Sequence, residues 1–481
     1  MAALGRRQGR TVSRAETLNN GCGEAEILLA TNSPCQDNTA PVSTTANQGR
    51  TRRFFDKDRQ DQRGEFQRDR DRILYCSAFR RLAEVTQVVS AAEGYSFHNR
   101  LTHTLKVAQI ARRLSEKLTA EQKREARALH GPDPEVAEAA ALAHDLGHPP
   151  FGHIAEEELQ RITPPEGLED GFEGNAQSFR IVTKLAIRTR KYDGLNLTAA
   201  TLNAILKYPH FRAELGEYER KWGVYPEERE VFQWARETVH AIPRKRTVEA
   251  EIMDWSDDIA YSVFDVDDFY RAGMIPLDQV LADQPERERF LESAKKRLTR
   301  WKKKDVEAIL QAFRDLVKNF SPASFGGRFQ GRAEQRAVLR EWTSLLVARY
   351  IEAIRLQIPG ESSDGRSVNI TPELKNEVEA LKQLVWHYVI ESERLVTQQH
   401  GQRTVVRELF ELFVSHAKDG IYEIFPEPYR TTLVTGSDKD TFDKDRVRVV
   451  IDMISGLTET QAFRLHQRLS GRSSGSILDH H

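Results

Sequence analysis

Residues 135–153 read EVAEAAALAHDLGHPPFGH, and this stretch decides the predicted fold. Its first part, Glu135 to Leu146, is rich in alanine and holds no proline, a composition typical of a buried helix. Near the end of this segment an imidazole and a carboxylate stand side by side, at His144 and Asp145. Buried charge is costly unless it is paired or binds a metal. Two prolines and a glycine then force a bend, so we expect a helix that brings polar ligands to a sharp turn.

A second helix is expected over Leu101 to Leu118, because apolar residues recur there at helical spacing. These positions are Leu101, Leu105, Ala108, Ile110, Ala111 and Leu114. The segment contains His103, and Arg100 precedes it by three residues, so the two side chains share a helix face. A lone histidine in such a place is more often a core or capping residue. His103 becomes a candidate metal ligand only in combination with the His-Asp pair.

A third helix is expected over Thr247 to Tyr270, which contains neither proline nor glycine. Asp257, Tyr261 and Asp265 are spaced four residues apart, so two carboxylates and a phenol lie along one stripe. Apolar neighbours on the other faces favour a packed helix over a solvated acidic one. Two histidines and two aspartates on three helices would form four metal ligands and leave positions open for water and substrate.

Beyond the bend, His153 and Glu156 are three residues apart on a starting helix and can therefore meet. A carboxylate orients a histidine and makes it more basic, which suits a general acid or base, although a surface pair remains an alternative. The glycines beside Glu173 and Asn175 indicate either a close backbone approach to a ligand or a helix start. The Lys207-Tyr208-Pro209 run indicates a phosphate contact or an ordinary helix end.

The composition limits the class of protein. The chain has 481 residues, of which 39% are hydrophobic and 30% charged, and its formal net charge is -1, so anionic ligands must be met by local clusters. No apolar run approaches the roughly 20 residues of a membrane span, and no secretory signal is recognisable. Three widely spaced cysteines indicate a reducing cytoplasm. Strand-like alternation is sparse, so we predict an all-α protein.

These stretches resemble the HD-domain deoxynucleoside triphosphate triphosphohydrolases, the dGTPase-like enzymes. Order and spacing match over roughly residues 55–470, and HDLGHPPFGH followed by FEGNAQ is the most specific part. The matching motifs are Phe79 to Leu82, Thr86 to Val88, His98 to His103, Ala143 to His153, Phe172 to Gln177, Lys207 to Pro209, Asp257 to Tyr261 and Val450 to Thr458. The resemblance implies an HD-domain helical phosphohydrolase fold with additional C-terminal helices.

The resemblance also implies an activity, the hydrolysis of a dNTP (dGTP among the candidates) to the deoxynucleoside and inorganic triphosphate. The implied metal ligands are His103, His144, Asp145 and Asp257. His153 would transfer a proton or act near the α-phosphate, with Glu156 orienting it. The implied substrate contacts are Arg100, Lys207 and Tyr208 to phosphates or sugar, Gln87, Tyr261 and Asp265 to the deoxyribose and its 3′-hydroxyl, and Asn175.

The implied cofactor is a divalent metal, and Mn, Mg, Fe, Co, Ni and Zn are all compatible with histidine and aspartate ligands. A further Mg²⁺ that accompanies the nucleotide is also expected. Implied partners are the dNTP, other copies of the chain in a homo-oligomer, and a nucleotide or single-stranded DNA effector, with no membrane. The expected organisation is a flexible tail over 1–50, an HD phosphohydrolase core over 51–275, a helical C-terminal region over 276–470 and a frayed tail over 471–481.

The chain departs from the family pattern at three positions: Val85 replaces a cation, and Met453 and Ser455 stand where Tyr and Ala are usual. These changes put base preference and regulation in doubt more than chemistry. Two other functions stay open. One is a different HD nucleotide phosphohydrolase, such as a 5′-nucleotidase or a signalling-nucleotide hydrolase. The other is a nucleic-acid-binding regulatory protein with a relic site, for which the charged strip Arg52 to Arg72 could contact phosphates; that strip could equally be a solvated helix face.

Overall fold

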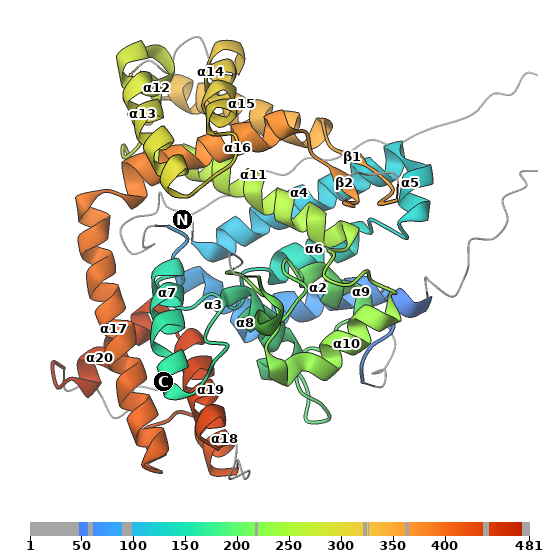
Figure 1. Ribbon diagram of the computed structural model, residues 1–481, viewed down its shortest axis with the longest axis vertical. Coiled ribbons are helices and arrows are strands. Elements are labelled where there is room, and N and C mark those ends of the chain that lie inside the picture. The colour runs from blue at the N-terminus through green and yellow to red at the C-terminus, as the bar shows by residue number, and fades with distance from the viewer. Residues whose placement is uncertain are drawn as a thin grey trace, which may run out of the picture. The chain divides into compact units, whose positions relative to one another are not determined.

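The computed structural model describes residues 48–55, 61–88, 99–216, 220–320, 325, 327–360, 365–435 and 442–473. Over these ranges the chain is built from helices with one two-stranded antiparallel sheet, so the predicted all-α class is confirmed (Figure 1). Most of the two predicted tails lies outside the described residues. Among the described residues, none of the helices combines the length and apolar character that crossing a bilayer requires.

The helices are α2 (Glu65–Tyr75), α3 (Ser77–Arg81), α4 (Arg100–Glu121), α5 (Lys123–Ala128), α6 (Pro134–Ala143), α7 (His153–Ile162), α8 (Gly174–Arg180), α9 (Ala199–Ile205), α10 (Arg229–Thr238), α11 (Val248–Arg271), α12 (Leu277–Ala282), α13 (Gln284–Arg300), α14 (Val306–Phe320), α15 (Ala333–Glu352), α16 (Pro372–Val385), α17 (Glu393–Lys418), α18 (Tyr429–Thr435), α19 (Phe442–Ser455) and α20 (Glu459–Leu469). The strands are β1 (Arg355–Leu356) and β2 (Val368–Asn369).

The three helices expected to carry metal ligands are α4, α6 and α11, and each packs against the other two. Local caps explain where they begin: the Asn99 side chain accepts from the Thr102 N–H at the start of α4, and Asp133 caps α6. The apolar face of α4 differs from the predicted one in two respects. Leu105 is 46% exposed, and Val107, which was not among the predicted positions, is fully buried.

A second apolar cluster joins α7 to the C-terminal helices, and α17 packs against both α7 and α19 (Figure 1). The largely apolar run from Thr404 to Val414 lies within α17. The motif from Val450 to Thr458 contributes a buried carboxylate, that of Asp452 on α19. It accepts from Arg180 Nε at 2.9 Å and from Gln177 Nε2 at 2.9 Å, and both donors lie on α8. The C-terminal helices therefore contact both α7, the helix that follows the sharp turn, and α8.

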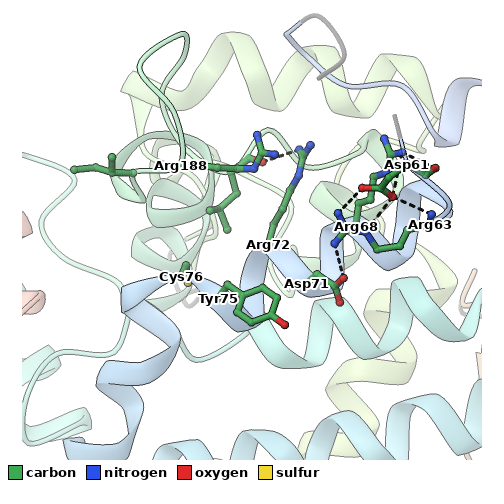
Figure 2. Close-up of a pocket in the computed structure, with 10 residues that line it drawn as sticks. Asp61, Arg63, Arg68, Asp71, Arg72, Tyr75, Cys76 and Arg188 are labelled. Atoms are coloured by element: carbon green, nitrogen blue, oxygen red, sulfur yellow. Dashed lines mark hydrogen bonds and ion pairs between the residues drawn. The ribbon is translucent and has the colours of Figure 1, made fainter. Parts of the chain in front are cut away.

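The charged strip at the N-terminal side is largely an internal ion-pair network (Figure 2). Buried Arg53 donates to Asp69 at 2.6 Å, and Arg63 lies between Asp61 and Asp71, its guanidinium nitrogens 2.6 and 2.7 Å from their carboxylates. The described part of the strip is therefore divided: Arg53, Arg68 and Asp69 are buried, whereas Asp61, Arg63 and Gln67 are exposed, as the solvated-face alternative expects. The carboxylates also offset much of the positive charge that contact with a polyanion would need.

Candidate active site

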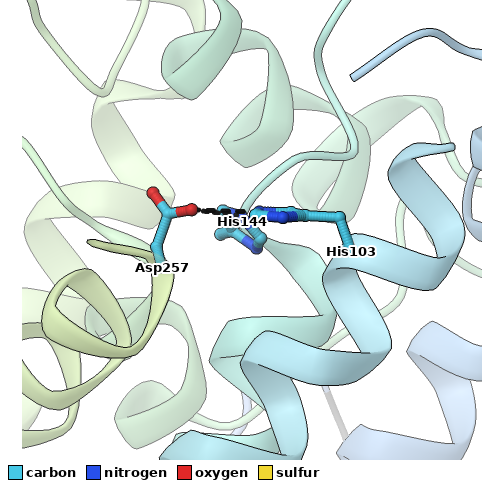
Figure 3. Close-up of side chains that lie close together, drawn as sticks. All are labelled: His103, His144 and Asp257. Carbon is cyan, nitrogen blue, oxygen red and sulfur yellow. Dashed lines mark hydrogen bonds and ion pairs between the residues drawn. The ribbon is translucent and has the colours of Figure 1, made fainter. Parts of the chain in front are cut away.

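The helices α4 and α11 and the turn after α6 bring His103, His144 and Asp257 together (Figure 3). Asp257 Oδ1 lies 3.1 Å from His103 Nε2 and 3.6 Å from His144 Nε2. One ligand atom of each residue lies within 4.8 Å of the others, a spacing that can hold a metal ion. These residues are 41 and 113 positions apart in the chain, so only packing of the three helices creates the group.

The ring of His144 is held in one orientation. Its Nδ1 lies 2.6 Å from the Ala141 carbonyl oxygen and donates to it, which leaves the Nε2 lone pair facing Asp257. This Nε2 atom is buried and has no hydrogen-bond partner among the described residues. Burial disfavours the charged ring, yet the carboxylates of Asp145 and Asp257 outweigh it and raise the pKa of His144 to about 8. The two carboxylates therefore create a negative potential at Nε2 that favours a cation, either a proton or a metal ion that replaces it.

Asp145 stands beside this group with its two oxygens in different roles. Its Oδ2 accepts from the Arg100 guanidinium at 2.7 Å, while Oδ1 lies 3.4 Å from His144 Nε2 and 3.2 Å from His148 Nδ1. Burial opposes its ionisation, but His144 and Arg100 lower the pKa of Asp145. Arg100 keeps Nε and one terminal nitrogen buried without a partner among the described residues. Those donors can still meet an anion.

Lys207 occupies the other side of Asp257. Its Nζ lies 3.0 Å from Asp257 Oδ2 and 2.9 Å from Asp254 Oδ1, so it holds the carboxylate by the oxygen remote from the imidazoles. The ring of Tyr208 lies 5.7 Å from the guanidinium carbon of Arg246. Sequence reasoning missed Asp254 and Arg246, because ion pairs between distant elements leave no periodic signal.

His153 and Glu156 meet as predicted, with His153 Nδ1 2.9 Å from Glu156 Oε2. The histidine side chain is 61% exposed and the glutamate 8% exposed, so a buried carboxylate orients an accessible imidazole. His148, which was not singled out, lies near both: its ring centroid is 5.2 Å from that of His153. Its position in the HDLGH motif was the available signal. Lys221, also missed, contacts Glu156.

Some of the remaining predicted substrate residues keep a polar atom without a hydrogen-bond partner, whereas Asn175 is bonded within the protein. Asp265 is buried, and burial raises its pKa to about 7. Its Oδ2 atom and the Oε1 atom of Gln87 are both buried and have no hydrogen-bond partner among the described residues. Tyr261 lies on α11, 5.8 Å below the ammonium of Lys382. Asn175 instead donates to Glu173, the N-cap of α8, so the helix-start alternative holds for this stretch.

Gly147 is the residue that lets the His-Asp turn pack on α8. A Cβ atom there would lie 2.2 Å from the Gly174 carbonyl oxygen and 2.2 Å from the Ser178 nitrogen, both backbone atoms. Gly147→Ala is therefore expected to lower the free energy of unfolding by about 1–3 kcal/mol or more. Gly401→Ala is the control, since no atom lies near its added Cβ, and it should stabilise α17 by up to about 1 kcal/mol. Urea unfolding of both variants checks the opposite signs; equal stabilities would contradict the packing described.

Comparison with known proteins places this site within a matched region. Residues 100–262 match the HD domain family, and residues 368–468 match the family described as phosphohydrolase-associated domain. A deoxyguanosinetriphosphate triphosphohydrolase-like protein of Streptomyces coelicolor is 38% identical, with 86% of this chain and 94% of the relative covered. Proteins of the same description are 37% identical in Corynebacterium efficiens (86% and 93% covered) and 31% identical in Wolinella succinogenes (85% and 96% covered).

Proposed function

The chain belongs to the family of HD-domain deoxyguanosinetriphosphate triphosphohydrolase-like proteins, and from that premise we propose that it hydrolyses a deoxynucleoside triphosphate to the deoxynucleoside and inorganic triphosphate. The observation that carries the proposal is the buried Nε2 of His144, which has no hydrogen-bond partner among the described residues and lies 3.6 Å from Asp257 Oδ1. A structural histidine would satisfy both ring nitrogens, whereas a ligand presents one lone pair to a cation.

A divalent metal fits the donor set of two imidazoles and two carboxylates. In the proposal His103, His144, Asp145 and Asp257 hold it, and the bound cation supplies Lewis-acid stabilisation of charge on the phosphate oxygens. Mixed nitrogen and oxygen ligands leave Mn, Mg, Fe, Co, Ni and Zn as candidates.

The proposed reaction forms one bond from a water oxygen to the α-phosphorus and breaks the bond from that phosphorus to the nucleoside 5′-oxygen. His153 provides a proton to the departing 5′-oxygen, and the proton of the attacking water is released. Glu156 holds the imidazole through Nδ1, so Nε2 is the atom that exchanges the proton. The two unpartnered donor positions of Arg100 suit a phosphate oxygen of the substrate.

The sugar would lie along α11 in the same proposal. Tyr261 would pack under the deoxyribose, where a 2′-hydroxyl would collide with the ring. The unpartnered oxygens of Asp265 and Gln87 would face the sugar, and one of them would accept from the 3′-hydroxyl. Lys207, Tyr208 and Asn175 complete the proposed substrate set. A homo-oligomeric assembly, a nucleotide or single-stranded DNA effector and a cytoplasmic location also belong to this proposal.

The decisive assay incubates the purified chain with each dNTP and with GTP, in Mn²⁺ or Mg²⁺, and identifies the phosphate product by ion chromatography. Equimolar triphosphate and deoxynucleoside are expected, with GTP turned over more slowly. Orthophosphate as the sole phosphate product would instead favour another HD phosphohydrolase. No turnover, together with nucleic-acid binding that survives His144→Ala, would favour a regulatory protein with a relic site.

A further inference from the structure

A lysine lies between two buried carboxylates behind the His153–Glu156 pair. Lys221 Nζ lies 2.5 Å from Glu156 Oε1 and 3.0 Å from Glu173 Oε1. The two glutamate side chains are 8% and 2% exposed, whereas the lysine side chain is 41% exposed. Lys221 thus reaches from the surface to two buried carboxylates. The proposed reaction gives the lysine no role.

We infer that Lys221 is a positioning residue that keeps Glu156 anionic and directed at His153. The inference rests on the proposed function, because it assigns the lysine a task in the same proton transfer. Glu156 uses Oε2 for His153 and Oε1 for Lys221, and the Gly174 N–H also donates to Oε1, at 3.4 Å. The lysine is therefore the charged group at the end of the carboxylate that the histidine does not contact.

The second carboxylate explains why a fixed cation is needed. Glu173 is the N-cap of α8 and accepts from the N–H groups of Asn175 at 2.6 Å and Ala176 at 3.1 Å, so it is held beside Glu156. Two buried carboxylates that contact the same ammonium group do not both stay ionised without that counter-charge. With the lysine removed, one of them would take a proton.

The groups facing Glu156 are Lys221, Glu173, His148 and His153. Burial opposes ionisation of Glu156, but the hydrogen bond from His153 and the charge of Lys221 hold its pKa well below the usual range. Burial raises the pKa of Glu173 in the same pocket. The charge of Lys221 thus favours the anionic form of both carboxylates, and at Glu156 it acts together with the hydrogen bond from His153.

The same residues allow a rival interpretation. His148, His153 and Glu156 each offer an atom within 4.8 Å of the others and could hold a second metal ion. The ammonium group of Lys221 argues against this, because it already neutralises Glu156 and would repel a nearby cation. A proton-transfer pair supported by a lysine accounts for all of the contacts.

The test compares Lys221→Met, Lys221→Arg and the double variant Lys221→Met with Glu173→Gln. Lys221→Met is expected to lower kcat by about 10- to 100-fold, the loss typical of removing a group that orients a functional histidine, with KM nearly unchanged. The acid limb of the kcat profile should move to higher pH, because Glu156 would then protonate at a higher pH and lose its hold on His153. Arginine should restore part of the rate.

The double variant distinguishes a positioning role of Lys221 from a purely structural one. Glu173→Gln removes the competing anion, so it should recover most of the activity that Lys221→Met loses. No recovery, or a rise in KM at constant kcat, would overturn the inference in favour of a structural role or a direct substrate contact. Lys295→Met is the matched control: its ammonium lies 2.6 Å from Glu307 on the surface, and its loss should leave the rate unchanged.

A measurement without substrate keeps the inference testable if no dNTP is hydrolysed. The Glu156 carboxyl can be titrated by ¹³C NMR in glutamate-labelled protein, with Glu156→Gln used for assignment. Its pKa should rise in Lys221→Met and return toward the wild-type value in Lys221→Arg; an unchanged pKa overturns the inference. A wild-type chain inactive on every dNTP would reject the proposed function, whereas wild-type turnover that needs His153 but not Lys221 would reject only the role of the lysine.

Discussion

Replacing Asp145 by alanine is expected to abolish both metal binding and turnover while leaving the chain helical. Asp145 Oδ1 lies 3.4 Å from His144 Nε2 and 3.2 Å from His148 Nδ1, so alanine removes an oxygen donor from the proposed ligand set. Alanine also leaves the buried Arg100 without its ion-pair partner, which should cost about 3–5 kcal/mol of stability. Metal content by plasma mass spectrometry, activity on the best dNTP and far-UV circular dichroism measure the three effects.

A companion substitution separates ligand loss from destabilisation. Asp145→Asn keeps the shape and an acceptor for Arg100 but weakens the ligand, so it should lose metal with a smaller loss of stability. Asp69→Asn is the matched control: Asp69 is fully buried and lies 2.6 Å from Arg53, remote in sequence from the proposed ligands, and its variant should be less stable yet keep its metal. Turnover that survives Asp145→Ala would show that the metal assignment is wrong.

Replacing His153 by alanine is expected to lower kcat by about 10²- to 10⁴-fold, the contribution of a general acid or base, while metal is retained. The side chain is 61% exposed, so its removal should change the free energy of unfolding by less than about 0.5 kcal/mol. Single-turnover rates, metal content and melting temperature test these statements together. The effect on kcat should exceed that on KM, because the proton moves only in the transition state.

The control for this experiment is another histidine–glutamate pair. His466 Nε2 lies 2.6 Å from Glu408 Oε2 on the C-terminal helices, and His466→Ala should keep full activity. Loss of metal in His153→Ala would place His153 among the ligands, where it would join His148 and Glu156. Unchanged kcat in His153→Ala would remove it from the mechanism.

Much of the fold was predictable because the helical spacing of apolar residues is visible within a single segment of sequence. The periodic segments around His103 and Asp257 became α4 and α11, within one residue at three of the four ends and three residues short at the end of α4. Leu105 was misassigned, since several apolar residues in one helix leave open which arc faces the core. The paired strands β1 and β2 have two residues each, too short for alternation to show in the sequence.

The sequence by itself determined the helical class, the positions of the candidate ligands and the kind of metal chemistry they favour. These follow from helical periodicity and from the donor atoms of each side chain, both of which are local properties. Tertiary structure alone decided which atoms meet: the Nε2 of His144 aimed at Asp257, Lys207 on the far oxygen of the same carboxylate, and Lys221 between Glu156 and Glu173. Such pairings join segments far apart in the chain, and no local pattern specifies how two helices face each other.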